Sequence, residues 1–332
     1  MSITDHLSRL PLGVMPTPLH PLAHLSSALR GPQLFVKRED MSGIGAGGNK
    51  VRKLSFLLAD AHAQGATVIL THGSSQSNHC ALTACAAAMQ GMRCELFLNG
   101  DDPGTRTGNL SIETLLDARL FFTGPSDAQN MEKQLAQRAE KLRQQGDVPY
   151  MIGLGGSNSL SVAGYTSAIE EVTQQITDGV LPNYMVVAAG SLGTLAGIIL
   201  GTWVLELSCH VDGMSVLWPI TQAKQILDVL LNDARKAYFP HVLPRTNYTL
   251  HDTYLGKGYG YPTQAGSEAA SLVARTEGLL LDNTYTAKAM AGLITGCQQQ
   301  RYRPGDRVLF WHTGGLGGFF AEVNGGKRVS LS

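Results

Sequence analysis

Residues 43–54 read GIGAGGNKVRKL, a glycine-rich loop that leads directly into a basic segment. The apolar run Leu34–Lys37 before this stretch predicts a strand. Leucines spaced three and four residues apart after it predict a helix over Lys50–Gln64. The stretch therefore predicts a strand–loop–helix unit with Lys50 at the start of the helix, as in sheets of α/β proteins.

The same alternation continues along the chain. It predicts further strands at Thr67–Thr71, Arg93–Leu98, Pro149–Ile152, Tyr184–Ala188, Ser215–Trp218 and Arg307–Trp311. It predicts further helices at Asn78–Gln90, Ala128–Gln145, Leu160–Ile176, Thr194–Glu206, Thr221–Tyr238, Gly266–Glu277 and Thr286–Gln300. Alternation of this kind predicts parallel sheets with helices on both faces, and ligands bind at the carboxyl ends of such strands.

Length, charge and cysteine content indicate which classes of protein this chain can belong to. The 332 residues suffice for about two domains, and 26 basic residues balance 26 acidic ones. A net charge of zero argues against partners held by bulk electrostatics, so we expect no nucleic-acid and no membrane binding. The five cysteines include no CxxC pair, which argues against a metal site and favours reduced thiols in a cytoplasmic protein. Residues 1–12 lack the apolar core of a signal peptide.

The loop Gly43–Gly48 also matches the GxGxxG pattern of dinucleotide-binding proteins. Those proteins need an acidic residue after the following strand to hold a ribose hydroxyl. Here that strand ends in Leu70-Thr71-His72-Gly73, without an acid. The sequence therefore disfavours a nicotinamide enzyme.

A second glycine-rich loop, Gly190-Ser191-Leu192-Gly193-Thr194, separates an apolar strand from an apolar helix. Backbone N–H groups converge in such a loop and the helix start adds positive potential, so the loop fits a phosphate monoester. A tight strand–helix turn without a ligand has the same composition. On the residues alone, both interpretations stay open.

Several short motifs follow one another in a fixed order. They are Pro16-Thr17-Pro18-Leu19, Lys37-Arg38-Glu39-Asp40, Gly47-Gly48-Asn49-Lys50, Gln76-Ser77-Asn78-His79, Gly155-Gly156-Ser157-Asn158, Gly190 to Thr194, Gly258-Tyr259-Gly260, Tyr285 to Leu293 and His312-Thr313-Gly314-Gly315. Over essentially the whole chain, this order resembles the D-cysteine desulfhydrase and 1-aminocyclopropane-1-carboxylate (ACC) deaminase family. These are pyridoxal-phosphate (PLP) enzymes with the tryptophan-synthase-β fold, fold type II.

The resemblance implies an α/β fold of two domains, with twisted, parallel-rich sheets flanked by helices. A small domain would comprise residues 49–161, and a large PLP-binding domain would comprise residues 1–48 and 162–332. The active site would lie in the cleft between them. The resemblance further implies a homodimer that acts on a small amino acid.

The resemblance also assigns roles around the cofactor. Lys50 would carry it, because its amine starts a helix after a glycine turn, where helix-start potential and burial favour the reactive neutral form. Gly190, Ser191, Leu192, Gly193 and Thr194 would hold the phosphate. Asn78 would hold the phenolic oxygen, and Thr313 matches the residue that meets the pyridine nitrogen.

The helix start at Gln76, Ser77, Asn78 and His79 would bind the substrate, whose carboxylate suits N-terminal N–H groups. Without the resemblance, Ser77 or Asn78 is equally well a helix cap, and His79 a hydrogen-bonded structural histidine. Tyr259 and Tyr285 match the two active-site tyrosines of the family. They would join Lys50 and Ser77 as catalytic residues, although packing is the commoner fate of a tyrosine.

Two threonines bear on the reaction. Thr313 would face the pyridine nitrogen, and Thr286 stands where the ACC deaminase branch carries glutamate. Neutral hydroxyls leave the ring a moderate electron sink, which suffices for losing a good leaving group from Cβ. We therefore predict a PLP-dependent lyase in which Lys50 removes the α-proton of D-cysteine, giving pyruvate, sulfide and ammonia.

Other substrates and one other class stay open. L-cysteate, which would release sulfite, ranks second and ACC ring opening third, and a PLP-binding protein without turnover is the alternative outside enzymes. The sequence departs from the family at Ser55, at Ala81-Leu82 and at Leu316-Gly317-Gly318-Phe319. We expect these departures near the substrate, so they leave its identity open.

Overall fold

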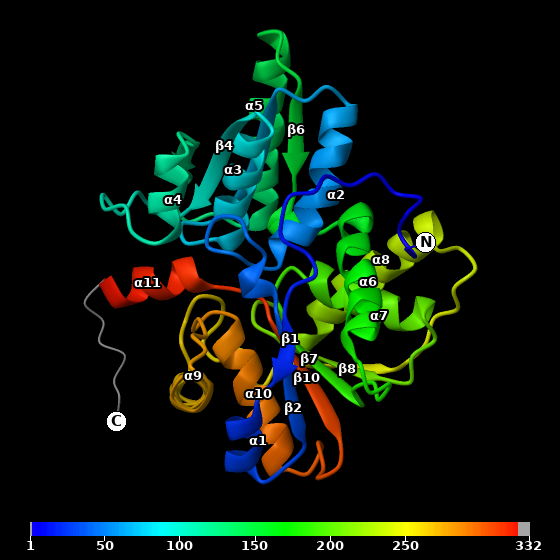
Figure 1. Ribbon diagram of the computed structural model, residues 1–332. Helices are drawn as coiled ribbons and strands as arrows, with labels where there is room; N and C mark the ends of the chain where they lie inside the picture. The colour runs from blue at the N-terminus through cyan, green and yellow to red at the C-terminus, as the bar shows by residue number, and fades with distance from the viewer. Residues whose placement is uncertain (1, 325–332) are drawn as a thin grey trace.

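The structure, a computed structural model, describes residues 2–324 and contains two sheets (Figure 1). In the larger sheet every neighbouring pair is parallel except β1 with β2. Its strands, in spatial order, are β1 (Leu19–Pro21), β2 (Gln33–Arg38), β10 (Arg307–His312), β7 (Tyr184–Ala189), β8 (His210–Ser215) and β9 (Tyr248–His251). The smaller sheet is wholly parallel. Its strands, in spatial order, are β5 (Arg119–Phe122), β4 (Arg93–Asn99), β3 (Val68–Ser74) and β6 (Pro149–Ile152).

Helices flank both sheets (Figure 1). Around the smaller sheet lie α2 (Lys50–Ala63), α3 (Asn78–Met89), α4 (Asn109–Leu115) and α5 (Ala128–Gln144). On one face of the larger sheet lie α6 (Ser159–Gln175), α7 (Gly193–Val204) and α8 (Ile220–Tyr238). On its other face lie α1 (Ala23–Leu29), α9 (Gln264–Glu277) and α10 (Thr286–Gln298), and α11 (Leu316–Asn324) follows β10.

Strand β10 shows why the larger sheet is buried on both faces. Its successive side chains point to opposite sides. Leu309 and Trp311 pack with α6, α7 and α8, whereas Val308 and Phe310 pack with α1, α9 and α10. An uninterrupted apolar run is therefore what a parallel strand between two helical layers requires.

Strand β8 lies at His210–Ser215, so the prediction of a strand over Ser215–Trp218 is wrong. The observed strand contains Asp212, which has no place in an apolar pattern. Its carboxylate is nevertheless buried, because it accepts hydrogen bonds from His251 Nε2 (2.6 Å) and Tyr302 Oη (2.8 Å). Both partners are distant in sequence, so local periodicity gave no sign of them.

The other predicted helices and strands match observed ones to within a few residues, as for the helix that spans Lys50–Ala63. The sequence missed β1, α1, α4, β5, β9 and α11. All of these elements are short, from three residues in β1 to nine in α11, and a short element gives a weak periodic signal.

The small domain predicted at residues 49–161 contains the four-stranded sheet. Its upper limit falls inside α6, which packs against α7 and α8 on the larger sheet. The division of the chain at that point stays a prediction.

The uncharged segment 185–205 forms β7 and α7, which are buried in the core of the larger sheet. Within residues 2–324, no helix combines the length and apolarity needed to cross a membrane.

A buried ion network joins α2 to the larger sheet. Arg52, two residues after Lys50, donates from Nε to Glu39 Oε2 (2.7 Å) and from Nη1 to Glu171 Oε2 (2.9 Å). Lys37 on β2 also binds Glu171, and Tyr165 Oη donates to Glu39 Oε2 (2.8 Å). Glu39 follows β2 and Glu171 lies on α6, so these ion pairs hold the first turn of α2 against the larger sheet and its helix α6.

Glu113 on α4 gives a pH-dependent contribution to stability. It is fully buried, and neither carboxylate oxygen has a hydrogen-bond partner among the described residues. Burial raises the pKa of Glu113 from 4.5 to about 8. Below pH 8 the folded protein therefore keeps a proton that the unfolded chain releases above pH 4.5.

We predict that the wild type loses stability between pH 5 and pH 8 relative to Glu113→Gln, by a few kcal/mol at about 1.4 kcal/mol per pKa unit. Urea unfolding at both pH values measures the difference. Glu132→Gln, at an exposed position on α5, is the matched control and should leave the pH dependence unchanged. Parallel losses in wild type and Glu113→Gln would contradict the assignment.

Candidate active site

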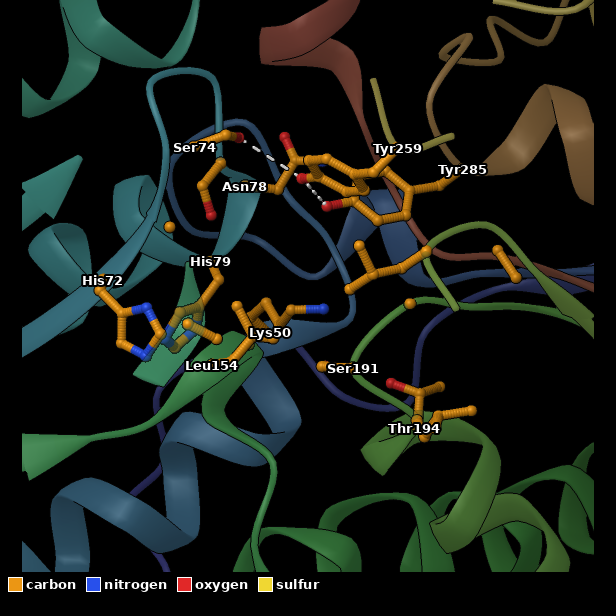
Figure 2. Close-up of a pocket in the computed structure, with 18 of the residues that line it drawn as sticks. Lys50, His72, Ser74, Asn78, His79, Leu154, Ser191, Thr194, Tyr259 and Tyr285 are labelled. Atoms are coloured by element: carbon orange, nitrogen blue, oxygen red, sulfur yellow. Dashed lines mark hydrogen bonds between the residues drawn. The ribbon is translucent and has the colours of Figure 1, made fainter. Parts of the chain in front are cut away.

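A cavity lies between the two sheets, at the carboxyl ends of β3 and β7 (Figure 2). This is where open parallel sheets bind ligands. The structure brings most of the predicted site residues to its walls. They are Lys50, Ser77, Asn78, His79, Gly190, Ser191, Leu192, Thr194, Tyr259, Tyr285 and Thr313.

Lys50 is the first residue of α2, and its side chain points into this cavity (Figure 2). Its Nζ donates to Asn49 Oδ1 (3.0 Å), and Asn49 Nδ2 donates to Thr194 Oγ1 (2.8 Å). Burial lowers the pKa of Lys50 from 10.5 to about 8, so a much larger share of the amine is neutral near neutral pH than in an exposed lysine, although the ammonium form still predominates. A neutral amine is what attack on an aldehyde requires.

The loop Gly190–Thr194 connects β7 to α7. Its left-handed residue is Leu192, with φ +66°, rather than a glycine. Gly193 is needed for another reason: a Cβ there would lie 2.5 Å from Ser157 Oγ and 2.8 Å from Lys53 Nζ. Gly193 therefore reflects the close packing of this loop against α2 and the segment that precedes α6.

Lys53 is a residue that sequence reasoning missed. Its ammonium is buried one helical turn after Lys50, where it donates to Gly155 O (2.5 Å) and Ser157 Oγ (2.7 Å). Ser157 Oγ in turn donates to Ser191 Oγ (2.8 Å) in the loop. Burial and then Lys50 lower the pKa of Lys53. The three-residue spacing of the two lysines was the available signal.

These features fit the phosphate of PLP. The start of α7 supplies backbone N–H groups and positive potential, and Thr194 supplies a hydroxyl. Gly155 lets Ser191 approach closely, because a Cβ at position 155 would lie only 2.2 Å from Ser191 Oγ. The donor set and the glycine cradle suit an anion beside a reactive lysine.

The start of α3 brings Ser77, Asn78 and His79 to the cavity. Ser77 is the N-cap and its Oγ accepts from Cys80 N (3.2 Å), so the helix-cap interpretation is confirmed, whereas the substrate-binding role of Ser77 stays a prediction. Gln76, in contrast, does not line the cavity. Its Oε1 accepts from Asn109 N (2.9 Å) and its Nε2 donates to Thr107 O (3.0 Å). The Gln76 side chain is therefore engaged with the segment at the start of α4, and a substrate-binding role for Gln76 stays a prediction.

His79 has the surroundings of a structural histidine. Thr71 Oγ1 donates its proton to Ile152 O (2.8 Å), so His79 Nε2, at 2.8 Å from Thr71 Oγ1, must be the donor to it. Burial and the charges of Lys50 and Lys53 lower the pKa of His79, so the ring is neutral. The ring borders the cavity, but its Nε2 hydrogen bond holds it to β3.

Tyr259 and Tyr285 meet at the opposite wall, with their hydroxyl oxygens 2.5 Å apart (Figure 2). Ser74 Oγ lies 3.4 Å from the Tyr259 hydroxyl. Burial raises the pKa of both phenols, so both are protonated. Asp282 fixes Tyr285 by accepting from its backbone N–H (2.9 Å). The pair can therefore hold and relay a proton.

Thr313 lines the cavity, whereas Thr286 does not. The Thr286 hydroxyl donates to Asp282 Oδ1 (2.7 Å) in the protein interior. Within residues 2–324, no aspartate, glutamate or arginine lines this cavity. The polar groups that remain are neutral, apart from the lysine amine.

His72, the fifth residue of β3, is a lining residue that the sequence did not single out. It is 1% exposed, and its Nε2 has no hydrogen-bond partner within the described chain. A polar residue at the carboxyl end of a buried strand was the signal. Burial lowers the pKa of His72, so the ring is a neutral donor and acceptor at the cavity wall.

The departures at Ser55, Ala81 and Leu82 are buried outside the cavity, and residues 316–319 do not line it either. Ser55 Oγ donates to Val51 O within α2 (3.0 Å). None of these positions therefore forms part of the cavity wall, and their proximity to the substrate stays a prediction.

Comparisons with known proteins agree with this geometry. Residues 10–314 match the family described as pyridoxal-phosphate dependent enzyme. D-cysteine desulfhydrase of Klebsiella pneumoniae subsp. pneumoniae is 40% identical over 318 residues, 94% of this chain and 95% of that protein. D-cysteine desulfhydrase of Salmonella typhi is 38% identical over 322 residues, 95% of this chain and 97% of that protein.

Solved structures confirm the predicted fold. An ACC deaminase homologue superposes with a TM-score of 0.90 at 32% identity and covers 97% of this chain and 96% of that chain. Processed threonine deaminase isoform 2 from Solanum lycopersicum, at 13% identity, has a TM-score of 0.68 and shares the fold alone over 97% of this chain and 90% of that chain. The resemblance, the fold type and the PLP cofactor predicted from the sequence are confirmed.

We predict that Lys50 of the cofactor-free protein reacts with an amine-directed reagent with a midpoint near pH 8, because burial disfavours its ammonium form. Competitive labelling followed by peptide mapping measures this midpoint. Exposed Lys133 is the internal reference, and Lys50→Ala removes the signal. A midpoint above pH 10 would show that the amine is not desolvated.

Proposed function

The chain belongs to the family of pyridoxal-phosphate-dependent enzymes, and we propose that it is a lyase that converts D-cysteine and water to pyruvate, sulfide and ammonia, with the cofactor on Lys50. The observation that carries this proposal is the partly buried Lys50 side chain in a cavity that is also lined by Gly190, Ser191, Leu192 and Thr194. Relatives named D-cysteine desulfhydrase that are aligned over nearly the whole chain support the substrate.

When bound, the cofactor supplies an electron-withdrawing ring that stabilises negative charge at Cα of an amino acid. The rest is done by side chains of this protein. Lys50 removes the proton from Cα, as its lowered pKa permits near neutral pH. Ser77 and the N–H groups at the start of α3 orient the substrate carboxylate. The Tyr259–Tyr285 pair holds the proton that the departing sulfur takes up.

The character of the cavity wall favours β-elimination over ring opening. Thr313 is a neutral hydroxyl, and within residues 2–324 no carboxylate lines the cavity. The wall therefore offers no negative charge to hold a proton on the pyridine nitrogen, which makes the ring a moderate electron sink. A moderate electron sink suffices for the loss of a thiolate from Cβ, whereas breaking the carbon–carbon bond of ACC requires a stronger one.

The same wall favours a thiol over a sulfonate. L-cysteate would bring a second anionic group on Cβ, and such groups are usually held by arginine or a further lysine. Among the described residues, Lys50 is the one cationic side chain that lines the cavity.

The proposal is tested by loading the purified protein with PLP and measuring product from a panel of substrates. We expect pyruvate and sulfide from D-cysteine, less pyruvate from L-cysteate and L-cysteine, and little 2-oxobutyrate from ACC. Lys50→Ala should abolish all turnover. If ACC gives the highest kcat/KM, the choice of reaction is wrong. A protein that binds PLP and releases nothing from any substrate would be a binding protein without turnover.

We further predict that Ser77→Ala and Tyr285→Phe keep the visible absorption of bound PLP but lower kcat at least about tenfold, a loss of roughly 1.4 kcal/mol of transition-state stabilisation. The cause is the loss of a hydroxyl that touches the substrate. Tyr261→Phe, at a residue 58% exposed in the same loop as Tyr259, should keep the wild-type rate. If both Ser77→Ala and Tyr285→Phe turn over at the wild-type rate, the proposed catalytic roles of Ser77 and Tyr285 are wrong.

We also propose a homodimer in the cytoplasm. The compartment is supported by the cysteines, because all five are buried and unpaired, as suits a reducing environment. Light scattering of the purified protein measures the assembly state.

A further inference from the structure

Asn109, the first residue of α4, joins that helix to the loop that precedes α3. It is 1% exposed. Its Nδ2 donates to Gln76 O (2.9 Å) and to Asn78 Oδ1 (2.8 Å), and its backbone N–H donates to Gln76 Oε1 (2.9 Å). The backbone of α11 closes over the other side of its amide, since a Cβ on Gly317 would lie 2.1 Å from Asn109 Oδ1.

This arrangement fixes the direction of two amides. A backbone carbonyl has no proton to give, so the NH2 group of Asn109 must face Gln76 O. The second proton on that nitrogen points to Asn78, which must therefore present its oxygen. The Asn78 NH2 group is then left for the cavity that Asn78 lines.

The other amides in the cavity wall are already engaged. Asn49 accepts from Lys50 and donates to Thr194, and Asn99 is bonded through both amide atoms to the backbone of Ser126. Within residues 2–324, no hydrogen bond is formed by Asn78 Nδ2. Among the asparagines that line the cavity, Asn78 is thus the one whose NH2 group forms no hydrogen bond within the described residues.

We propose that Asn109 is a positioning residue that turns the NH2 group of Asn78, rather than its oxygen, toward the phenolic oxygen of the cofactor. The inference rests on the proposed function, in which Asn78 binds that oxygen. A donor stabilises the ionised phenolic oxygen, whereas an amide oxygen in the same place repels it. Asn109 therefore controls the ionisation of a group that it does not touch.

Asn109→Asp tests this, because a carboxylate has the shape of the amide but no proton to donate. Asn78 must then turn its NH2 group to Asp at 109 and its oxygen to the cavity. The readouts are the dissociation constant of PLP and the ratio of the visible to the near-ultraviolet absorption band of bound PLP, which reports ionisation of the phenolic oxygen. We expect Asn78→Ala and Asn109→Asp each to lower the ratio and to weaken PLP binding roughly tenfold.

A double-mutant cycle separates positioning from a structural role. In the Asn78→Ala background, Asn109→Asp should bring no further change in the band ratio. Asn232→Asp, at an exposed position on α8, is the matched control and should leave both readouts at wild-type values. The melting temperature of the cofactor-free protein shows whether each variant folds, and uncharged Asn109→Ala replaces Asn109→Asp in the cycle if the latter does not.

Three outcomes would overturn the inference. If Asn78→Ala changes the ratio and Asn109→Asp does not, Asn109 does not orient Asn78, although the contact of Asn78 with the cofactor stands. If Asn109→Asp has the same effect with and without Asn78, it acts through the fold. If Asn78→Ala changes neither readout, Asn78 does not bind the phenolic oxygen. Pyruvate release by the wild type tests the proposed reaction separately from all three.

Discussion

The buried guanidinium of Arg52 fixes the start of α2, and with it the position of Lys50. Arg52 binds Glu39, which follows β2, and Glu171, which lies on α6. The Arg52 side chain therefore connects α2 to the larger sheet. Gly164 makes the contact possible, because a Cβ there would lie 2.6 Å from Arg52 O. Buried ion pairs contribute little net stability, but removing one partner costs about 3–5 kcal/mol, so they fix geometry more than they stabilise the fold.

The glycines of the loop before Lys50 serve the same geometry. Gly47 has φ +70°, and a Cβ there would lie 1.8 Å from Asp40 O. Gly48 pairs with Gly314, where a Cβ on Gly314 would lie 2.7 Å from Gly48 Cα. The GxGxxG match therefore reflects the close approach of two backbone segments beside the site. Glycine is selected in such contacts by the absence of a side chain, whatever the ligand.

The electrostatics of the cavity follow from burial more than from charge pairing. Desolvation lowers the pKa of His79 and raises that of Tyr259 and Tyr285, so these three side chains are neutral, and it lowers the pKa of Lys50 to about 8. The fixed charges of the neighbourhood, such as Arg52 and its carboxylates, are kept in a separate network. In the proposed reaction, such a cavity leaves the stabilisation of negative charge at Cα to the cofactor.

The sequence by itself determined the alternating architecture, the glycine loops and the placement of Lys50 at a helix start, because these depend on spacing between near neighbours. Only the tertiary structure decided where β8 lies, that Gln76 turns to α4 and that Lys53 is linked through Ser157 to the loop Gly190–Thr194. In each case the partner comes from a distant part of the chain: Asp212 is satisfied by Tyr302, and Lys53 by Gly155. Local periodicity indicates which face of a helix or strand is buried. The hydrogen-bond partner of a buried polar group depends instead on how helices and strands that are distant in sequence pack together.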